Sequence, residues 1–374
     1  MLEVILLTIL AFTALFYYFF LARVQIGLTR LFKPHKLVRY PFISIVIAAR
    51  NEESSIEECL FSVLRQHYPS ERYEVIVVND HSTDATKEKV QQLQKVYKNL
   101  KLLDVTDGIH GKIHAISLGV EETKGEIICS TDADCVASPT WILTMAHHFS
   151  EGTAMVAGPV VLEKNDESFL STFDRLEFLG VITIAAGLIG AKRPIICNGA
   201  NLAYKRDVFF LAGGFGEEAV DNDDELLMSR ILKRNLGSID FAWEPLAIVR
   251  TKPVKSLQSF LHQRMRWATK KGHYEDISIL AELIVLYFFF VSLIVAFILG
   301  ICWDNTLLLP TALSFLGKII LEYLTLKTGA RLWRDTIPIW KFLIAELLHV
   351  PYILITAFCA QFFSLRWKGR ALKQ

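Results

Sequence analysis

Residues 127–134 read IICSTDAD, a short apolar run that ends in two aspartates, and this stretch indicates the fold class of the chain. A continuous apolar run of this kind is typical of a strand buried on both faces of a parallel sheet. Three similar runs precede it, at 44–49 (SIVIAA), 74–78 (EVIVV) and 100–105 (LKLLDV). Amphipathic stretches that begin near Ser55, Thr83, Lys112 and Pro139 separate these runs. The alternation predicts an α/β domain, a parallel sheet flanked by helices, from Pro41 to about Arg250.

Asp132 and Asp134 stand at the mouth of the strand, one residue apart. Their mutual repulsion would raise the pKa of one carboxyl unless a cation lay between them. Oxygen ligands at this spacing suit Mg²⁺ or Mn²⁺, which keep open positions for the phosphate oxygens of a substrate. A solvated turn explains the pair equally well when it is taken alone, so both interpretations stay open at this point.

Polar clusters follow the first two strands as well, as Arg50-Asn51-Glu52-Glu53 and as residues 79–84 (NDHSTD). Helix capping and turn formation account for either cluster by itself. A doubly wound sheet, however, binds ligands at the carboxyl ends of its strands, and two clusters on neighbouring ends favour a site there. The chain has neither a Gly-x-Gly-x-x-Gly fingerprint after the first strand nor a Gly-x-x-x-x-Gly-Lys-[Ser/Thr] phosphate loop.

Two later segments of the chain are further candidates for the functional site. Residues 221–225 (DNDDE) precede an apolar helix. Either the helix dipole favours acidic side chains at this position, or one of them serves as a general base for an acceptor hydroxyl. Residues 254–274 predict an amphipathic helix at a membrane surface, and Gln263, Arg266 and Trp267 share one of its faces. Arg266 suits a diphosphate and Trp267 a sugar ring, with an interfacial anchor as the alternative.

The apolar runs outside the predicted α/β domain are candidates for membrane helices. The uncharged runs 4–22 and 283–303 are long enough to cross a bilayer, whereas 305–326 is interrupted by Lys318 and Glu322. The run 342–365, which contains Pro351, could cross, re-enter or lie in the interface. The run 4–22 lacks the basic start and the small-residue cleavage site of a signal peptide, which predicts a retained anchor. Because Arg23 and Arg30 follow this run, the positive-inside tendency predicts that the α/β domain lies in the cytosol. Three full crossings after that domain would leave the basic C-terminus outside, against the same tendency.

Charge and cysteine content narrow the functional classes. The formal net charge of +1 over 374 residues gives no support for nucleic-acid binding. The six cysteines show neither paired nor metal-ligand spacing, as expected of reduced, buried thiols on the cytosolic side.

Taken in order, these clusters resemble the family 2 inverting glycosyltransferases, especially the membrane-embedded branch that includes cellulose, hyaluronan and poly-N-acetylglucosamine synthases. The similarity covers roughly residues 41–274 and the flanking apolar helices. It implies the nucleotide-diphospho-sugar transferase (GT-A, Rossmann-like) fold, a nucleotide-sugar donor and an Mg²⁺ or Mn²⁺ ion. Carried over residue by residue, it assigns donor contacts to Asn51, Glu52, Asp80, Lys112, Asp132, Gln263, Arg266 and Trp267.

The resemblance also implies the remaining roles. Asp132 and Asp134 would bind the metal, and Asp224 would be the catalytic base. Asn222 precedes the acid pair where the family often has Glu-Asp or Gly-Asp-Asp, which leaves Asp223 as the alternative base. The residues assigned to the acceptor side are Asn198, Gly199, Asn201 and Trp267.

The predicted organisation is an anchor at 1–23, a glycosyltransferase domain at 40–250, an interfacial segment at 251–276 and a transmembrane region of two or three spans at 277–365. The predicted function is transfer of a sugar, from a UDP-sugar, to a lipid or growing glycan at the cytosolic face of a bacterial cytoplasmic membrane. The alternatives are a non-catalytic scaffold that binds nucleotide-sugar and a sugar nucleotidyltransferase. Donor sugar, acceptor, processivity and oligomeric state are not readable from motifs.

Overall fold

The computed structural model describes residues 1–31, 37–164, 168–216, 223–268, 276–333, 335–360, 366–367 and 370–371. The chain divides into two compact units. We call Arg30–Asn165 with Lys192–Pro253 the sheet unit, and Met1–Thr29 with Asp166–Ala191 and Val254–Gln374 the helical unit. The predicted domain at 40–250 did not anticipate this division, because residues 166–191 group with the helices that precede and follow the sheet unit.

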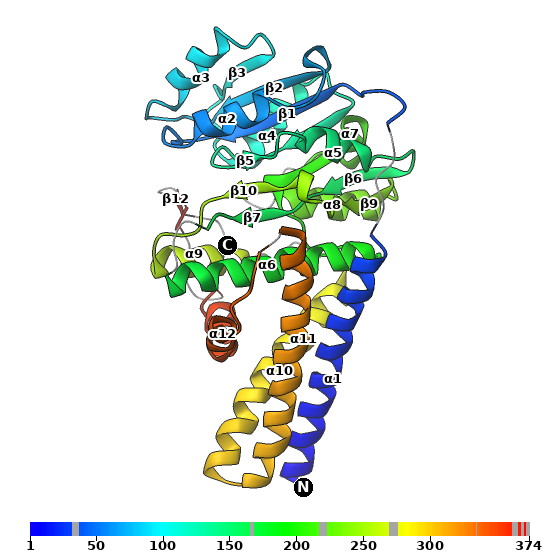
Figure 1. Cartoon of the computed structure of the whole chain (residues 1–374), viewed down its shortest axis with the longest axis vertical. Helices are drawn as coiled ribbons and strands as arrows, with labels where there is room; N and C mark the ends of the chain where they lie inside the picture. Colours follow the sequence, from blue (N-terminus) through cyan, green and yellow to red (C-terminus); the bar gives the residue numbers. More distant parts are fainter. Residues whose placement is uncertain are drawn as a thin grey trace. The chain divides into compact units, whose positions relative to one another are not determined.

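The sheet unit is built on a seven-stranded sheet in the order β3-β2-β1-β4-β8-β6-β9 (Figure 1). Its strands are β1 (Ile43–Ala49), β2 (Tyr73–Asn79), β3 (Leu100–Asp104), β4 (Ile127–Ser130), β6 (Thr153–Ala157), β8 (Leu202–Lys205) and β9 (Ser238–Phe241). A smaller sheet in the order β5-β10-β7 joins Val136–Ala137, Val249–Thr251 and Val160–Leu162. All residues of β2, and all but one of β1, are buried, as expected of strands covered on both faces.

The four strands predicted from apolar runs are confirmed, and they pair in parallel: β1 lies between β2 and β4, and β3 lies beyond β2. The sheet also contains an antiparallel strand that the sequence did not predict, because β8 runs antiparallel to both β4 and β6. A buried antiparallel strand carries the same continuous apolar pattern as a parallel one, so periodicity does not separate them. The carboxyl ends of β1, β2 and β4 therefore meet at one edge of the sheet.

Helices cover the faces of the sheet. They are α2 (Ile56–Leu64), α3 (Thr86–Gln94), α4 (Lys112–Glu121), α5 (Trp141–His147), α7 (Arg206–Ala212) and α8 (Asp223–Lys233). The buried His148, which follows α5, contacts the carboxylates of Asp240 at 2.8 Å and Glu244 at 2.9 Å. Burial alone would lower the pKa of His148, but the hydrogen bonds to these two acids raise it to about 9. A charged imidazole therefore ties the end of α5 to β9.

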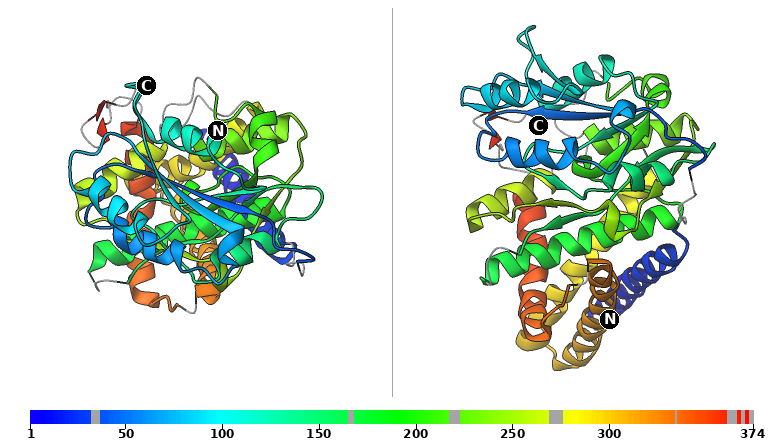
Figure 2. Two further views of the ribbon diagram at one scale, coloured as in Figure 1. Left: turned by 90° about the horizontal axis from the view of Figure 1, so that it is seen from above. Right: turned by 45° about the horizontal axis from the view of Figure 1, so that its top comes forward.

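The helical unit consists of α1 (Leu2–Thr29), α6 (Phe169–Gly190), α9 (Leu257–Ala268), α10 (Ile277–Cys302), α11 (Leu308–Trp333) and α12 (Ile339–Cys359), with a short hairpin of β11 (Arg366–Trp367) and β12 (Arg370–Ala371). Within the described residues, four segments are long and apolar enough to cross a bilayer: Glu3–Thr29, Ile277–Cys302, Asn305–Trp333 and Ile339–Cys359. α1, α10 and α11 lie side by side (Figures 1 and 2). α12 is seen almost end-on in Figure 1, so it runs across these three helices.

A close helix crossing joins α6 to the N-terminal helix. A Cβ added to Gly27 of α1 would lie 1.8 Å from the carbonyl oxygen of Gly187 in α6, and one added to Gly187 would lie 2.5 Å from the carbonyl oxygen of Val24. Small residues at such a crossing let two backbones approach each other closely. This packing explains why residues 166–191 belong to the helical unit.

A network of charged side chains is buried among α1, α11 and α12. The fully buried Lys318 places its Nζ 2.9 Å from the carboxylate of Glu322 and 3.2 Å from Nδ1 of His349, and it also contacts the carboxylate of Glu346. The hydroxyl of Tyr17 on α1 donates to Glu322. Ionisable groups in apolar helices are paired in this way because an unpaired charge there is costly.

Candidate active site

The loops after β1 and β2 are joined by hydrogen bonds that involve two of the predicted site residues. Asn51 has a positive φ of 52°, and its Oδ1 accepts a hydrogen bond from the Thr83 amide at 2.8 Å. The Glu52 amide donates to Oγ1 of Thr86 at 2.8 Å, and the Glu52 carboxylate accepts from Ser55 at 2.8 Å. These bonds fix the two strand ends against each other at the sheet edge.

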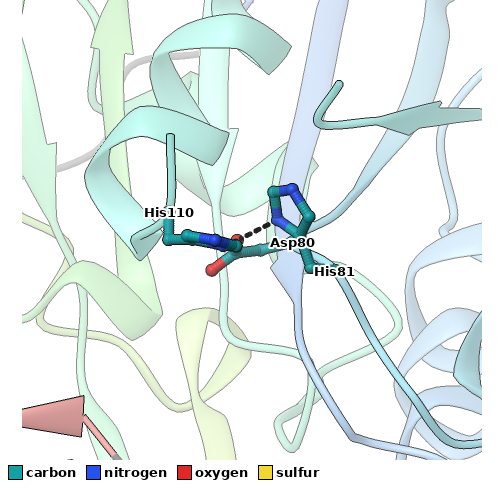
Figure 3. Close-up of side chains that lie close together, drawn as sticks. All are labelled: Asp80, His81 and His110. Carbon is teal, nitrogen blue, oxygen red and sulfur yellow. Dashed lines mark hydrogen bonds and ion pairs between the residues drawn. The ribbon is translucent and has the colours of Figure 1, made fainter. Parts of the chain in front are cut away.

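Asp80 connects the end of β2 to the start of α4. Its side chain is 3% exposed, and its Oδ2 accepts a hydrogen bond from the Gly111 amide at 3.2 Å. Nδ1 of His81 lies 3.0 Å from Oδ1 of the same carboxylate (Figure 3). Gly111 precedes α4 with a φ of 134°, a conformation that favours glycine. The sequence motifs gave no sign of this backbone contact.

Lys112, the first residue of α4, forms an ion pair with Asp132, with Nζ 2.7 Å from Oδ1. The contact brings the predicted diphosphate residue together with the predicted metal ligand at the end of β4. A helix N-terminus and a lysine both favour anions, so this corner of the site suits a phosphate group.

Asp134 faces the same corner. Ligand atoms of Asp132, Asp134 and Cys135 all lie within 4.8 Å of one another. Although the Asp134 side chain reaches solvent, its pKa is raised to about 6, first by partial desolvation of the carboxylate and then by repulsion from Asp132 and Glu52. Burial raises the pKa of the Cys135 thiol well above its usual value, so that thiol stays protonated. The hard ligands are therefore the two carboxylates, which fit Mg²⁺ or Mn²⁺.

Asp224, the second residue of α8, lies on the opposite side of Gly199 from Lys112 and Asp132. Its Oδ2 accepts a hydrogen bond from the Gly199 amide at 2.6 Å. A Cβ added to Gly199 would lie 3.5 Å from both Oδ2 of Asp224 and Nζ of Lys112. Gly199 therefore lies between the predicted base and the Lys112–Asp132 pair. The side chain of Asp223, the alternative base, lies outside the described residues.

The residues around Gly199 hold the loop in place. Oδ1 of Asn198 accepts from the Ala200 amide at 3.0 Å and caps the 3₁₀ turn Gly199–Asn201. Asn201 is 0% exposed: its Oδ1 accepts from the Trp141 indole at 2.8 Å, and its amide donates to the carbonyls of residues 159 and 247. These contacts correct the expectation that Asn201 faces the acceptor. Its amide is committed to the protein interior, and the role of Trp141 carried no sequence signal.

Gln263, Arg266 and Trp267 lie on α9 in the helical unit. The Trp267 ring packs against Phe178 of α6, with ring centroids 5.9 Å apart. The carbonyl oxygen of the Gln263 side chain accepts a hydrogen bond from Arg264. All three side chains are half-buried, so each keeps a surface that can meet a ligand.

The buried Arg264 holds α9 in place through contacts with aromatic rings and with carboxylates of α6. Its guanidinium lies 4.7 Å from the ring centroid of Phe260 and 4.2 Å from that of Trp267. It also pairs with the carboxylates of Asp174 at 2.6 Å and Glu177 at 2.5 Å, both on α6. Sequence reasoning missed Arg264, although its position, four residues after Phe260 and three after Leu261, places it on the apolar stripe of the helix. An arginine on a buried stripe requires acidic partners.

Residues 44–210 match the family model described as Glycosyl transferase family 2. The chain is 28% identical over 282 residues to the probable glycosyltransferase YdaM of Bacillus subtilis, covering 71% of this chain and 66% of the relative. It is 29% identical over 242 residues to a beta-monoglucosyldiacylglycerol synthase of Nostoc sp., covering 63% and 49%. A poly-beta-1,6-N-acetyl-D-glucosamine synthase of Staphylococcus epidermidis is 26% identical over 264 residues, covering 69% and 60%. The matched segments thus span less than two thirds of each relative's length.

Among solved structures, the chain is similar to the mannosyltransferase PcManGT from Pyrobaculum calidifontis in complex with GDP-Man and Mn²⁺. The TM-score is 0.59 at 19% sequence identity, and the match covers 97% of this chain and 99% of that chain. At this identity the likeness shows the fold. Together with the family match it confirms the predicted α/β nucleotide-diphospho-sugar transferase fold with flanking apolar helices.

Proposed function

We propose that this chain, whose residues 44–210 match the Glycosyl transferase family 2 model, is a membrane-bound inverting enzyme that transfers a sugar from a nucleotide-sugar to a lipid or growing glycan. The observation that carries the proposal is the connected set of contacts along one sheet edge. It runs from Asp80 through Gly111 to the neighbouring Lys112 and on to Asp132, with Gly199 joining Asp224 to the same corner. The residues that we propose as donor contact, metal ligand and base are thereby adjacent.

The donor we propose is a UDP-sugar. Asn51, Glu52 and Asp80 would contact the uridine part, because they stand at the ends of β1 and β2, where doubly wound sheets bind nucleotides. Lys112 would contact the diphosphate at the start of α4. Gln263, Arg266 and Trp267 remain donor and acceptor contacts predicted from the sequence, and Asn198 and Gly199 remain predicted acceptor residues.

Asp132 and Asp134 would hold Mg²⁺ or Mn²⁺, and the fit rests on two converging carboxylates beside a thiol that stays protonated. Bound there, the ion would neutralise negative charge on the diphosphate. Lys112 contributes positive charge at the same place, because its Nζ already lies against Asp132. Stabilisation of the leaving group by such fixed charges is the largest catalytic effect we expect in this site.

The chemical step is a direct displacement at the anomeric carbon. The acceptor oxygen forms the new glycosidic bond while the bond to the diphosphate oxygen breaks, and Asp224 takes the proton from the acceptor hydroxyl. Attack from the face opposite the leaving group inverts the configuration. The Gly199 amide, which donates to Oδ2 of Asp224, holds the carboxylate in position for this transfer.

The four apolar helices support an integral membrane protein, and we propose a cytosolic catalytic domain in a bacterial cytoplasmic membrane. α1, α10 and α11 would cross the bilayer, whereas α12 would lie in the cytosolic interface, because it runs across those three helices. α12 exposes Trp340 and Leu347, which can contact lipid, and its buried Glu346 pairs with Lys318 inside the protein. The basic C-terminus then stays on the cytosolic side, and the conflict with the positive-inside tendency disappears.

The test of the activity uses the full-length protein in detergent with bacterial lipid extract, Mn²⁺ and a panel of UDP-sugars. We expect UDP release with one donor and a product that carries one or more sugars. Pyrophosphate release from a sugar phosphate and UTP would establish the nucleotidyltransferase alternative. Nucleotide-sugar binding without turnover, for every donor and lipid, would establish the scaffold. Asp224→Asn is the matched control, because it should bind UDP but release it from the donor at least a hundredfold more slowly.

The test of the topology uses cysteine labelling in intact cells with a membrane-impermeant maleimide. Cys302, at the end of α10, is exposed and provides an internal control that should react from outside. A cysteine introduced as Gln374→Cys, in a Cys359→Ser background, should react only after the cells are permeabilised. Labelling of residue 374 from outside would refute the interfacial placement of α12.

A further inference from the structure

Two imidazoles face the Asp80 carboxylate from different segments of the chain (Figure 3). Nδ1 of His81 lies 3.0 Å from Oδ1 of Asp80, and Nδ1 of His110 lies 3.6 Å from the same oxygen. The two rings contact each other, with centroids 4.0 Å apart. His81 follows β2 and His110 precedes α4, so the cluster lies where these two segments meet. Nothing in the proposed transfer reaction uses either histidine.

The two carboxylate oxygens of Asp80 contact different partners. Oδ2 accepts from the Gly111 amide at 3.2 Å and lies 3.8 Å from Arg50, whereas Oδ1 faces both imidazoles. His81 has a φ of 56°, in the left-handed region that is uncommon for residues other than Gly and in which Asn, Asp and His are enriched. This backbone conformation accompanies a side chain turned towards the carboxylate.

We propose that Asp80, His81 and His110 form a binding site for a zinc-class transition metal ion. One ligand atom from each residue lies within 4.8 Å of the other two. In a tetrahedral zinc site with bonds of about 2.0–2.1 Å, ligand atoms are roughly 3.4 Å apart, and the two measured separations of 3.0 and 3.6 Å bracket that value. Three protein ligands leave the fourth position to water.

The site differs in chemistry from the carboxylate pair at Asp132 and Asp134. Imidazole nitrogen suits Zn²⁺, Co²⁺ and Cu²⁺, whereas carboxylate oxygen alone suits Mg²⁺ and Mn²⁺. His81 and His110 are half-buried and exposed, respectively, so an ion can reach them from solvent. A zinc-class ion should therefore choose the histidine site even when Mg²⁺ is abundant.

Occupancy should block the donor, and this part of the inference rests on the proposed function, which gives Asp80 a uridine contact. Oδ2 of Asp80 already accepts from the Gly111 amide, so Zn²⁺ at Oδ1, with its water ligand, would compete with the nucleobase for that oxygen. We therefore expect Zn²⁺ and UDP to compete for the free protein, so that saturating Zn²⁺ raises the Kd for UDP at least tenfold.

The experiment measures Zn²⁺ binding by calorimetry and Co²⁺ binding by visible absorption. It uses full-length protein in detergent with excess Mg²⁺ to fill the carboxylate pair. The variants are His81→Asn, since Asn51 and Asn235 already occupy similar φ values in this chain, and His110→Gln. The matched control is His114→Gln, because that nearby imidazole pairs with Asp107 at 2.8 Å and lies outside the cluster.

We expect one Zn²⁺ per chain, a tetrahedral Co²⁺ spectrum, and a loss of affinity of roughly tenfold or more in each cluster variant but not in His114→Gln. Unchanged affinity in His81→Asn and His110→Gln, or an octahedral Co²⁺ spectrum in the wild type, would overturn the metal site. The wild-type spectrum decides the question even if a variant fails to fold. If Zn²⁺ binds at the cluster but the Kd for UDP does not change, the metal site stands and the uridine contact proposed for Asp80 is wrong.

Discussion

Replacement of Asp224 by Asn tests the proposed base with little change of shape. In the structure Oδ2 of Asp224 accepts a hydrogen bond from the Gly199 amide at 2.6 Å, and the side chain is 9% exposed. Asn keeps an oxygen that can accept the same hydrogen bond, but it loses the negative charge and the ability to take a proton. The substitution therefore separates two roles of the carboxylate, holding the loop and acting as a base.

The two roles have different magnitudes. Loss of a general base lowers turnover by roughly 10² to 10⁴, which corresponds to about 3–5 kcal/mol of transition-state stabilisation. Exchange of a charged for a neutral hydrogen-bond acceptor at Gly199 weakens the loop contact by about 1 kcal/mol, or roughly fivefold in an equilibrium constant. A purely structural role for Asp224 therefore cannot account for a hundredfold loss of kcat.

The assay measures UDP release at saturating donor and acceptor over a range of pH, together with the Kd for UDP by calorimetry. We expect kcat of Asp224→Asn to fall at least a hundredfold, with the Kd for UDP within about fivefold of wild type. Asp223→Asn is the matched control and should keep most of its kcat. A kcat of Asp224→Asn within fivefold of wild type would refute the assignment, and a hundredfold loss in Asp223→Asn instead would transfer the role to that residue.

Three other substitutions test separate parts of the structure. Asp134→Asn removes one metal-facing carboxylate, so Mn²⁺ should no longer strengthen UDP binding in calorimetry; an unchanged Mn²⁺ dependence would contradict this role. His148→Gln should lower the free energy of unfolding by roughly 3 kcal/mol at pH 6, since folding raises the pKa of His148 from 6.5 to about 9. That stabilisation is complete below pH 6.5 and is lost as the pH rises through 9, so melting temperatures that stay equally far apart above pH 9 would count against it. Arg264→Met leaves the buried Asp174 and Glu177 without their cation and should cost about 3–5 kcal/mol of stability. Recovery is expected when both acids are also made neutral, and a single variant that melts like wild type would show that the pairing is unimportant.

The parallel half of the sheet and most of its ligand-binding edge were predictable from the sequence. Strands β1 to β4 are continuous apolar runs, and the polar residues that follow three of them must meet because parallel strands end at the same edge. Asp80 and Asp132 were therefore expected to be close together, whereas Lys112 and Asp224 were added to the site by the family resemblance; contacts through Gly111 and Gly199 bring all four residues together.

The features that were missed depend on partners distant in the chain. Strand β8 pairs with β4 across about 75 residues, and its direction leaves no mark on its apolar pattern. Asn201 resembles a loop residue until its contacts with Trp141 and two buried carbonyls are known. Arg264 resembles one more basic residue of an interfacial helix until Asp174 and Glu177 are placed beside it by α6. Such pairings follow from packing, which short-range periodicity does not report.

The buried network around Lys318 also has a consequence for the order in which the membrane helices assemble. Lys318 and Glu322 lie one turn apart on α11, so this helix can enter the bilayer with its charges already paired. α12 brings Glu346, which pairs with Lys318 across the two helices. Packing of α12 before α11 is in place would bury that acid without a cation. Because α11 precedes α12 in the chain, α11 is synthesised first. Lys318 is therefore already present when Glu346 of α12 needs a cation.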